Sequence, residues 1–406
     1  MQKTQFLPVL VSLDLPTDHC YHRLVLKRQA YRYRLSPTRR EAALLRQFLG
    51  CSRFVWNAIL AENQFRHAAG DPLKIGRASF CERLLVLKEK HVFLHEAPSQ
   101  PMQQALNDLV RAYERAFDPK LAAEPPVFKK KQNAQGIRFP QGFRLSGRAV
   151  FLPKIGWMPI RASKRTMKRK IAGEIKNVTV RLEAGLWYVS FQAERVVAEP
   201  VHPRPESRVG ADVGIAKFLA LSDGTFFDGA NALRTFQRRL ATLQRRLAKK
   251  VKFSANWRKA KARITKLHSR IANVRKDQIH KASYAISKNH AIVAMEDLRI
   301  KNMTATAKGT VENPGVKVAA KSALNRRMLD QGWGELRRQV GYKLKWAGGE
   351  LKLVDPRNTS RTCSQPNCGH VSQDNRLTQA DFLCVQCGHT ANADTNAAIN
   401  IVRRAG

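Results

Sequence analysis

The sequence is poor in acidic residues. Its 406 residues include 31 Asp and Glu against 73 Lys and Arg, which gives a formal net charge of +42. An ordinary solvated surface mixes both signs, so this imbalance indicates a polyanionic partner, either nucleic acid or an anionic membrane surface. The hydrophobic content of 43% is ordinary for a folded protein and excludes a chain that is disordered throughout.

Long hydrophobic runs are absent as well. No stretch approaches the ~20 uninterrupted apolar residues that a membrane-spanning helix requires. The run 6–13 is short, contains Pro8, is followed by Asp14, and lacks the basic start and cleavage site of a signal peptide. A membrane partner is therefore disfavoured, and we expect a cytoplasmic protein. Residues 1–21 show no clear period and are expected to form a disordered extension.

Cysteine is scarce, and four of the seven cysteines lie within 25 residues. They form two pairs, Cys363-x4-Cys368 and Cys384-x2-Cys387, each followed by Gly and His. A Gly turn lets two thiolates of one knuckle face a single ion, and two knuckles complete the tetrahedron that zinc favours. The pattern predicts one structural zinc ion. Four sulfurs suffice, so His370 and His389 are not expected to be ligands.

The first half of the chain reads as helices followed by strands. A basic strand is expected over 22–35, and Thr38 with Glu41 predicts a capping box that opens a helix, with Gly50 as its end and a second helix after it. Further helices are predicted over 77–92 and 99–117. From about 124 to 195 the alternation indicates strands, most clearly in a hairpin over 178–191 that turns at Ala184-Gly185. Trp187 and Phe191 in this hairpin either stack on bases or, as we favour, fill its core.

The second half begins after a Pro-rich linker at 200–205. Strands are expected at 209–215 and 217–221, with a short third one, and later at 291–296 and 351–355. A loop is expected to about 320, then one helix over 323–347. Between them, residues 234–281 hold 17 Lys or Arg and a single acid. The apolar spacing predicts two long helices with basic outer faces, and these supply our candidates for nucleic-acid contact: Arg238, Arg239, Arg245, Arg246, Lys249, Lys250, Arg258 and Lys259.

Three acids stand at the ends of apolar segments. Asp212 lies in the first strand of the second half, Glu296 ends a later strand, and Asp394 opens the last helix, where it could simply be an N-cap. Singly, each has such an ordinary explanation. Together they match a ribonuclease-H-like arrangement, in which distant carboxylates meet at one sheet edge and hold two divalent ions. Mg²⁺ suits oxygen ligands, so phosphodiester hydrolysis is the expected chemistry.

At this point the sequence resembles the TnpB family, RNA-guided endonucleases encoded by some bacterial insertion sequences and related to type V CRISPR effectors. The resemblance covers roughly 22–406. Its most specific parts are Tyr33-Arg-Leu-Ser-Pro with 50–57, Val209-Gly-Ala-Asp212-Val-Gly-Ile, Met295-Glu296-Asp-Leu, Val354-Asp-Pro-Arg-Asn-Thr-Ser-Arg-Thr-Cys363 and Ala393-Asp394-Thr-Asn-Ala-Ala-Ile-Asn-Ile. The four residues between Cys363 and Cys368, where the family usually has two, and the first 21 residues depart from the pattern.

The resemblance implies a multidomain α+β fold. A split β-barrel wedge domain at 22–40 and 124–204 would enclose a helical recognition domain at 41–123. A ribonuclease-H-like (RuvC) α/β nuclease domain at 205–359 and 391–406 would carry a zinc-ribbon insertion at 360–390. The implied partners are a guide RNA and double-stranded target DNA in a monomeric ribonucleoprotein, with Mg²⁺ at Asp212, Glu296 and Asp394. The basic helices would contact phosphates of the guide–target duplex.

Two other functions remain open from the sequence. A DNA-strand-transferring transposase uses the same two-metal chemistry, although a zinc ribbon just ahead of the third acid favours the endonuclease. A nuclease-dead, RNA-guided DNA-binding regulator is disfavoured because it has no use for three acids. The position of the ribbon also predicts that zinc helps to place Asp394, so that loss of Cys384 abolishes cleavage.

Overall fold

The computed structural model describes residues 23–406 except 122, 132–135, 162–170 and 377. The predicted extension over 1–21 lies outside these residues. The described chain divides into two compact units, 24–197 and 198–406, and the division falls just before the Pro-rich linker. No helix in the described ranges is long and apolar enough to cross a membrane.

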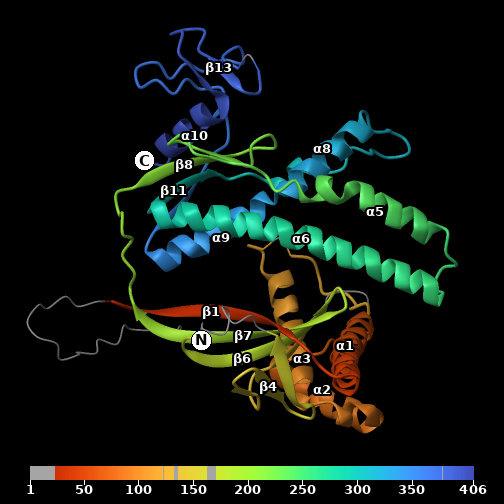
Figure 1. Cartoon of the computed structure of the whole chain (residues 1–406). Helices are drawn as coiled ribbons and strands as arrows, with labels where there is room; N and C mark the ends of the chain where they lie inside the picture. Colours follow the sequence, from red (N-terminus) through yellow and green to blue (C-terminus); the bar gives the residue numbers. More distant parts are fainter. Residues whose placement is uncertain (1–22, 122, 132–135, 162–170, 377) are drawn as a thin grey trace, which may run out of the picture. The chain divides into compact units, whose positions relative to one another are not determined.

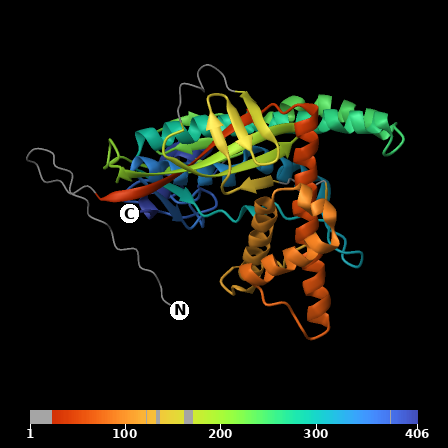
Figure 2. The ribbon, with the colours of Figure 1, turned by 90° about the horizontal axis from the view of Figure 1, so that it is seen from below.

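A curled seven-stranded sheet forms the framework of the first unit (Figures 1 and 2). Strands β2 and β3 are its two edges. Within the described residues no strand pairing joins these two edges, so the sheet curls but does not close into the predicted barrel. The strands, in spatial order, are β2 (Gly136–Phe139), β6 (Glu174–Glu183), β7 (Leu186–Ala198), β1 (Leu24–Leu35), β5 (Gly156–Arg161), β4 (Ala149–Leu152) and β3 (Arg144–Ser146).

The hairpin of β6 and β7 confirms the predicted turn. Glu183 pairs with Leu186, and the two residues between them, Ala184 and Gly185, have positive φ values of 49° and 80°. Positive φ at both positions gives a turn whose twist matches that of the strands. Trp187 and Phe191 are buried in the core, so base stacking by these two rings is wrong and the core role is confirmed.

Helices α1 (Arg39–Ala68), α2 (Arg77–Lys90) and α3 (Ser99–Phe117), with a short 3-10 helix η1 (Val92–Glu96), complete the first unit. The capping box of Thr38 and Glu41 is confirmed. The predicted end at Gly50 is wrong, because α1 continues unbroken through it. One glycine costs a helix only ~1 kcal/mol, and Phe48 before it and Val55 after it pack into the same core.

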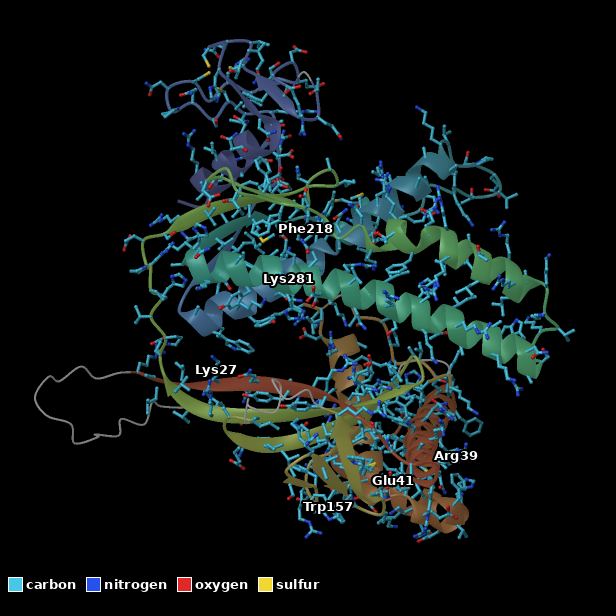
Figure 3. The ribbon with its side chains drawn as sticks, viewed as in Figure 1. Lys27, Arg39, Glu41, Trp157, Phe218 and Lys281 are labelled. Atoms are coloured by element: carbon cyan, nitrogen blue, oxygen red, sulfur yellow. The ribbon has the colours of Figure 1, made fainter. Side chains whose placement is uncertain are left out.

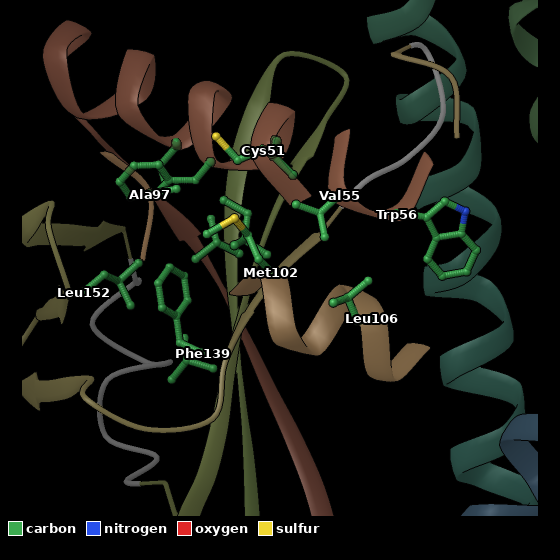
Figure 4. Close-up of a cluster of buried hydrophobic side chains, with 14 of the residues drawn as sticks. Cys51, Val55, Trp56, Ala97, Met102, Leu106, Phe139 and Leu152 are labelled. Carbon is green, nitrogen blue, oxygen red and sulfur yellow. The ribbon is translucent and has the colours of Figure 1, made fainter. Parts of the chain in front are cut away.

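That core joins the helices to the curled sheet. Cys51, Val55 and Trp56 of α1 and Met102 and Leu106 of α3 form one apolar cluster with Phe139 and Leu152 of the strands (Figure 4). The boundaries proposed for separate wedge and recognition domains thus lie within a continuous core, and they stay predictions.

The second unit contains a five-stranded sheet in the order β10 (Phe226–Phe227), β9 (Leu219–Leu221), β8 (Arg208–Val213), β11 (Ile292–Glu296) and β12 (Glu350–Val354). Strands β8, β11 and β12 are parallel, while β8, β9 and β10 are antiparallel neighbours. Helix α10 (Ala393–Arg404) packs closely on β8. Gly210 permits this approach, since a Cβ there would lie 1.9 Å from the carbonyl oxygen of Ala398.

Five further helices surround or extend from this sheet: α5 (Ala232–Ala248), α6 (Ala255–Asn289), α7 (Ile300–Met303), α8 (Val318–Gln331) and α9 (Trp333–Ala347). The two long basic helices are confirmed as α5 and α6, which pack through Leu240, Leu267 and Ile271. The single helix predicted over 323–347 is wrong. Gly332 has a φ of 75°, a left-handed conformation that ends α8 before α9 begins.

Candidate active site and metal centre

The geometry of the sheet brings the first two predicted acids together. Strands β8 and β11 are parallel neighbours, and Met295 pairs with Ala211. The next residue along each strand is Glu296 and Asp212, so the two acids leave the sheet at the same edge. Helix α10 lies against β8, and its first turn carries Asp394. All three side chains line one cleft.

Asp394 is not the N-cap of its helix. Asn392 takes that role, since its side-chain oxygen accepts hydrogen bonds from the backbone N–H groups of Asp394 and Thr395 at 3.0 and 3.2 Å. The capping explanation for Asp394 is therefore wrong. Its carboxylate instead lines the cleft and acts electrostatically on Asp212.

The cleft concentrates buried negative charge. Burial first, and then the carboxylates of Glu296 and Asp394, raise the pKa of Asp212 from 3.8 to about 8, against the charge of Arg376. Burial also raises the pKa of Glu296, against a hydrogen bond from the Thr359 hydroxyl, and the pKa of Asp394, against the charge of Arg376. Thr359 and Arg376 only partly offset the cost of ionising these acids. Bound cations would offset the rest, so the site is suited to them.

The donor set fits hard divalent ions. Three carboxylates supply only oxygen ligands, which Mg²⁺ prefers. Within the described part of the chain, the close cluster of three or more potential metal ligands is the group of four cysteines, and the three acids do not belong to it.

Arg376 is a residue of this site that the sequence did not reveal. It belongs to the cysteine segment, lines the cleft, and places Nη2 3.8 Å from Oδ1 of Asp394. Its charge lowers the pKa of both Asp212 and Asp394. A single arginine in a loop has no periodic or motif signal, so nothing in the sequence marks it. Thr359, which donates its hydroxyl to Glu296, stands within the quoted motif 354–363, where a role could have been sought.

The cleft has a volume of about 1380 Å³. This exceeds the ~300–1,000 Å³ of typical small-molecule pockets. Its lining also includes the basic side chains Arg234, His268, Arg326 and Arg327. A cleft lined by both acids and bases suits a polyanion that approaches bound cations.

The four predicted zinc ligands converge. The sulfurs of Cys363 and Cys387 are 3.6 Å apart, as are those of Cys368 and Cys384, and all four lie within 4.8 Å of one another. With Zn–S bonds of ~2.3 Å, a tetrahedral site has S···S edges of ~3.8 Å. The longer spacing of the first knuckle therefore does not prevent a tetrahedral set. His370 and His389 are not part of this group.

Hydrogen bonds tie the cysteine segment to the acids. Asn396 on α10 donates to the Thr362 carbonyl at 2.8 Å and accepts from the Ser364 N–H at 3.0 Å. Asn400, one turn later, donates to the carbonyls of Thr359 and Thr362 at 3.0 and 2.7 Å. Both asparagines are buried. We refer to these contacts between α10 and residues 359–364 as the asparagine clasp.

The eight basic candidates for nucleic-acid contact all lie exposed on the α5–α6 hairpin: Arg238, Arg239, Arg245, Arg246, Lys249, Lys250, Arg258 and Lys259. Figure 3 draws the side chains of both helices, with Lys281 labelled on α6. The apolar sides of α5 and α6 face each other in the core of the hairpin. The exposure agrees with a basic face, while contact with nucleic acid stays a prediction.

Comparison with known structures supports the fold. A Cas12f1–sgRNA–target DNA complex solved by cryo-electron microscopy superimposes with a TM-score of 0.53 at 18% sequence identity, over 90% of this chain and 83% of that one. The fold is therefore a mixed α/β fold of the class found in Cas12f1.

Family models and relatives identify the chain. Residues 190–307 match a model described as a probable transposase, and 333–401 match a Cas12f1-like TNB domain. A candidate RNA-guided DNA endonuclease of Escherichia coli (strain K12), InsQ, is 46% identical over 92% of this chain and 91% of its own length. Another, from Streptomyces pristinaespiralis, is 31% identical over 92% and 89%. The chain thus belongs to the TnpB family, which confirms the resemblance.

A third family model, described as a helix-turn-helix domain, matches residues 27–71. In this structure those residues contain strand β1 and the continuous helix α1. The matched region therefore lacks the break between two helices that the description implies.

Proposed function

We propose that this protein is an RNA-guided, divalent-metal-dependent DNA endonuclease associated with a transposable element. The observation that carries the proposal is the convergence of Asp212, Glu296 and Asp394 in one cleft that basic side chains also line. The names of its InsQ and Streptomyces relatives support the RNA-guided activity. The description of the matching family as a probable transposase supports the link to a mobile element.

The nuclease site would be of the RuvC, ribonuclease-H-like type. Its sheet has β8 in the centre, antiparallel β9 and β10 on one side and parallel β11 and β12 on the other, which accords with that assignment. Asp212, Glu296 and Asp394 would hold two Mg²⁺ ions, which activate water and stabilise the leaving oxygen of the phosphodiester. Thr359 would fix the orientation of Glu296 through its hydrogen bond.

Arg376 would serve the same reaction in two ways. Its guanidinium lowers the pKa of Asp212 and Asp394, so that both are ionised more readily for metal binding. It also offers planar N–H donors suited to a phosphate beside the acids. The four cysteines would bind one structural Zn²⁺ with no open coordination position.

The partners would be a guide RNA and double-stranded target DNA, held in a monomeric ribonucleoprotein in the cytoplasm. The exposed basic residues of α5 and α6 would contact phosphates, which contribute affinity without sequence information. The net charge of +42 accords with two nucleic-acid partners.

Strand transfer is the second candidate, because the matching family model is described as a probable transposase. It uses the same carboxylates, but its product joins a 3′ end to a new strand. A nuclease-dead regulator is disfavoured by the raised pKa of Asp212, because three acids crowded together destabilise a protein that does not bind cations there.

The decisive experiment uses the full chain with its co-expressed RNA, incubated with target and non-target plasmids in Mg²⁺. We expect cleavage of target DNA alone, and loss of cleavage after Asp212→Ala. Asp297→Asn is the matched control, since Asp297 follows Glu296 directly but is 59% exposed and paired with Arg337. Cleavage without RNA, or full activity of the Asp212 variant, would overturn the proposal. Joined products in place of cut ends would establish strand transfer.

A further inference from the structure

The loop that joins α5 and α6, together with the first turn of α6, carries an aromatic pair in which Phe253 is exposed and Trp257 is half-buried. Phe253 and Trp257 contact each other edge to face, with ring centroids 5.4 Å apart and planes at 61°. Phe253 is 59% exposed and its neighbour Val251 is 79% exposed. We call residues 249–261 the hairpin tip. Figures 1 and 2 show this loop at the end of the hairpin remote from the five-stranded sheet.

The backbone of the tip is strained at the aromatic residue. Phe253 has a φ of 68°, a left-handed conformation that is a genuine outlier for a bulky residue. A Gly or Asn at this position would form the turn more easily. The adjoining Ser254 already caps α6 by accepting a hydrogen bond from the Trp257 N–H. Helix formation alone therefore does not account for an exposed phenyl ring at this place.

The tip is also densely basic. Within it lie six cationic residues and no acid: Lys249, Lys250, Lys252, Arg258, Lys259 and Lys261. Two of them flank the rings, with Nζ of Lys252 5.3 Å from the Phe253 centroid and Nζ of Lys261 4.8 Å from the Trp257 ring. Aromatic faces among cations are the combination by which proteins hold unpaired nucleotides, stacking the base and pairing the phosphate.

The tip lies close to the catalytic cleft along the helix. Leu240 and Gln244 of α5 line the cleft, as does His268 of α6. Lys249 lies five positions beyond Gln244, which is roughly 8 Å along a helix axis. A strand that leaves the cleft along α5 therefore reaches the tip directly. In a duplex, neighbouring base pairs cover the base faces, so the rings select single-stranded nucleic acid.

We infer that Phe253 and Trp257 form a stacking site for bases of the single-stranded DNA that passes through the cleft. The tip holds the strand where it leaves the cleft along α5, by base stacking in addition to phosphate contacts. The identification of the strand as DNA rests on the proposed function, while stacking of unpaired bases rests on the tip alone.

The test measures binding by the full chain with its copurified RNA, in Ca²⁺ in place of Mg²⁺ so that no cleavage is needed. The probes are a short fluorescein-labelled oligothymidine strand and a strand of equal length whose central nucleotides lack bases. We expect fluorescence anisotropy to show about 5- to 150-fold tighter binding of the strand that carries bases, the range for stacking of one base. Equal binding of the two strands by the wild-type protein would overturn the inference.

Variants separate stacking from charge. Phe253→Ala with Trp257→Ala should abolish the preference for bases and leave the salt dependence unchanged. Lys250→Gln with Lys252→Gln should flatten the salt dependence and keep the preference. Tyr284→Ala is the matched control, because Tyr284 is a 61% exposed aromatic residue on the same helix, and it should change neither. Phe253→Leu keeps the apolar contact without an aromatic face, so it separates stacking from folding of the loop, and an undiminished preference in this variant would refute stacking.

The remaining outcomes distinguish DNA from RNA and this inference from the proposed function. If the preference for bases appears only after the copurified RNA is digested, the tip belongs to RNA and the DNA assignment is wrong. A protein that never cleaves DNA but still prefers strands with bases would refute the proposed function and leave the stacking site standing.

Discussion

Replacement of Asp212 by Asn should stabilise the metal-free protein while abolishing its activity. Burial, and then the charges of Glu296 and Asp394, hold the pKa of Asp212 at about 8, against 3.8 for the free side chain. A carboxyl whose folded pKa lies above its unfolded pKa takes up a proton on folding, so stability falls as pH rises between these two values. The loss therefore develops from about pH 4 to about pH 8 and is complete above that.

The magnitude follows from the two pKa values. A tenfold change in proton affinity corresponds to ~1.4 kcal/mol, so ionised Asp212 costs the metal-free fold on the order of 5 kcal/mol above pH 8 and roughly half as much at pH 6. Asn removes this cost. We expect the Asp212→Asn variant to exceed the wild type in stability at both pH values, with a gap that widens by about 2 kcal/mol from pH 6 to pH 8.

The assay follows the thermal unfolding transition of the second unit, residues 198–406, in Mg²⁺-free buffer. The buffer contains no chelator, because a chelator would also remove zinc. Added Mg²⁺ binds ionised carboxylates, so it should raise the Tm of the wild type more at pH 8 than at pH 6 and have little effect on the variant. Asp297→Asn, at an exposed ion pair, should show no gain. A variant that is no more stable than the wild type at pH 8 would refute the view that burial and the two neighbouring acids disfavour ionised Asp212.

Three other perturbations test the rest of the framework. Cys384→Ser should lower the zinc content measured by mass spectrometry and abolish DNA cleavage, and full cleavage by a zinc-free variant would contradict a structural ion. Thr359→Val removes a hydrogen bond that lowers the pKa of Glu296. The acidic limb of the pH–rate profile should therefore move to higher pH, and the rate should fall about tenfold. A limb that does not move would show that this hydrogen bond does not act on Glu296 during catalysis. Arg245→Glu with Arg246→Glu should weaken nucleic-acid binding and reduce the slope of log K against log salt by about two. An unchanged slope would show that this face of α5 is exposed to solvent and does not contact nucleic acid.

Local patterns in the sequence were enough to predict much of the fold. The capping box, the hairpin at Ala184-Gly185, and the two long helices with apolar inner faces depend on neighbours in the sequence, and all are present in the structure. The two errors in helix ends concern glycines. Gly50 lies within α1 because tertiary packing outweighs its low helix propensity, whereas Gly332 separates α8 from α9 because it adopts a left-handed conformation.

The candidate site was predictable where chemistry is concentrated in few residue types. Paired cysteines with Gly, and three acids that together end or open apolar segments, are rare enough in sequence to be recognised. Arg376, Asn396 and Asn400 are not, because their roles depend on which loop and which helix face meet in three dimensions. Phe253 shows the same limit, since exposure and a positive φ are properties of the folded loop.

The asparagine clasp explains why a zinc site should matter to a cleft that it does not line. The N–H of Ser364, which follows Cys363, donates to Asn396. Asn400 donates to the carbonyl of Thr359, whose hydroxyl donates to Glu296. Leaving such buried groups unpaired costs about 1–3 kcal/mol each, so the segment 359–364 and α10 keep their positions together.

Zinc bound by the four cysteines would fold their segment with an apparent free energy of ~10–16 kcal/mol. Since the same segment carries Arg376, loss of zinc should disturb Glu296 and Arg376 as well as Asp394. The expected signature of a zinc-free protein is therefore weaker Mg²⁺ binding at the acids, with the basic hairpin and its affinity for nucleic acid left intact.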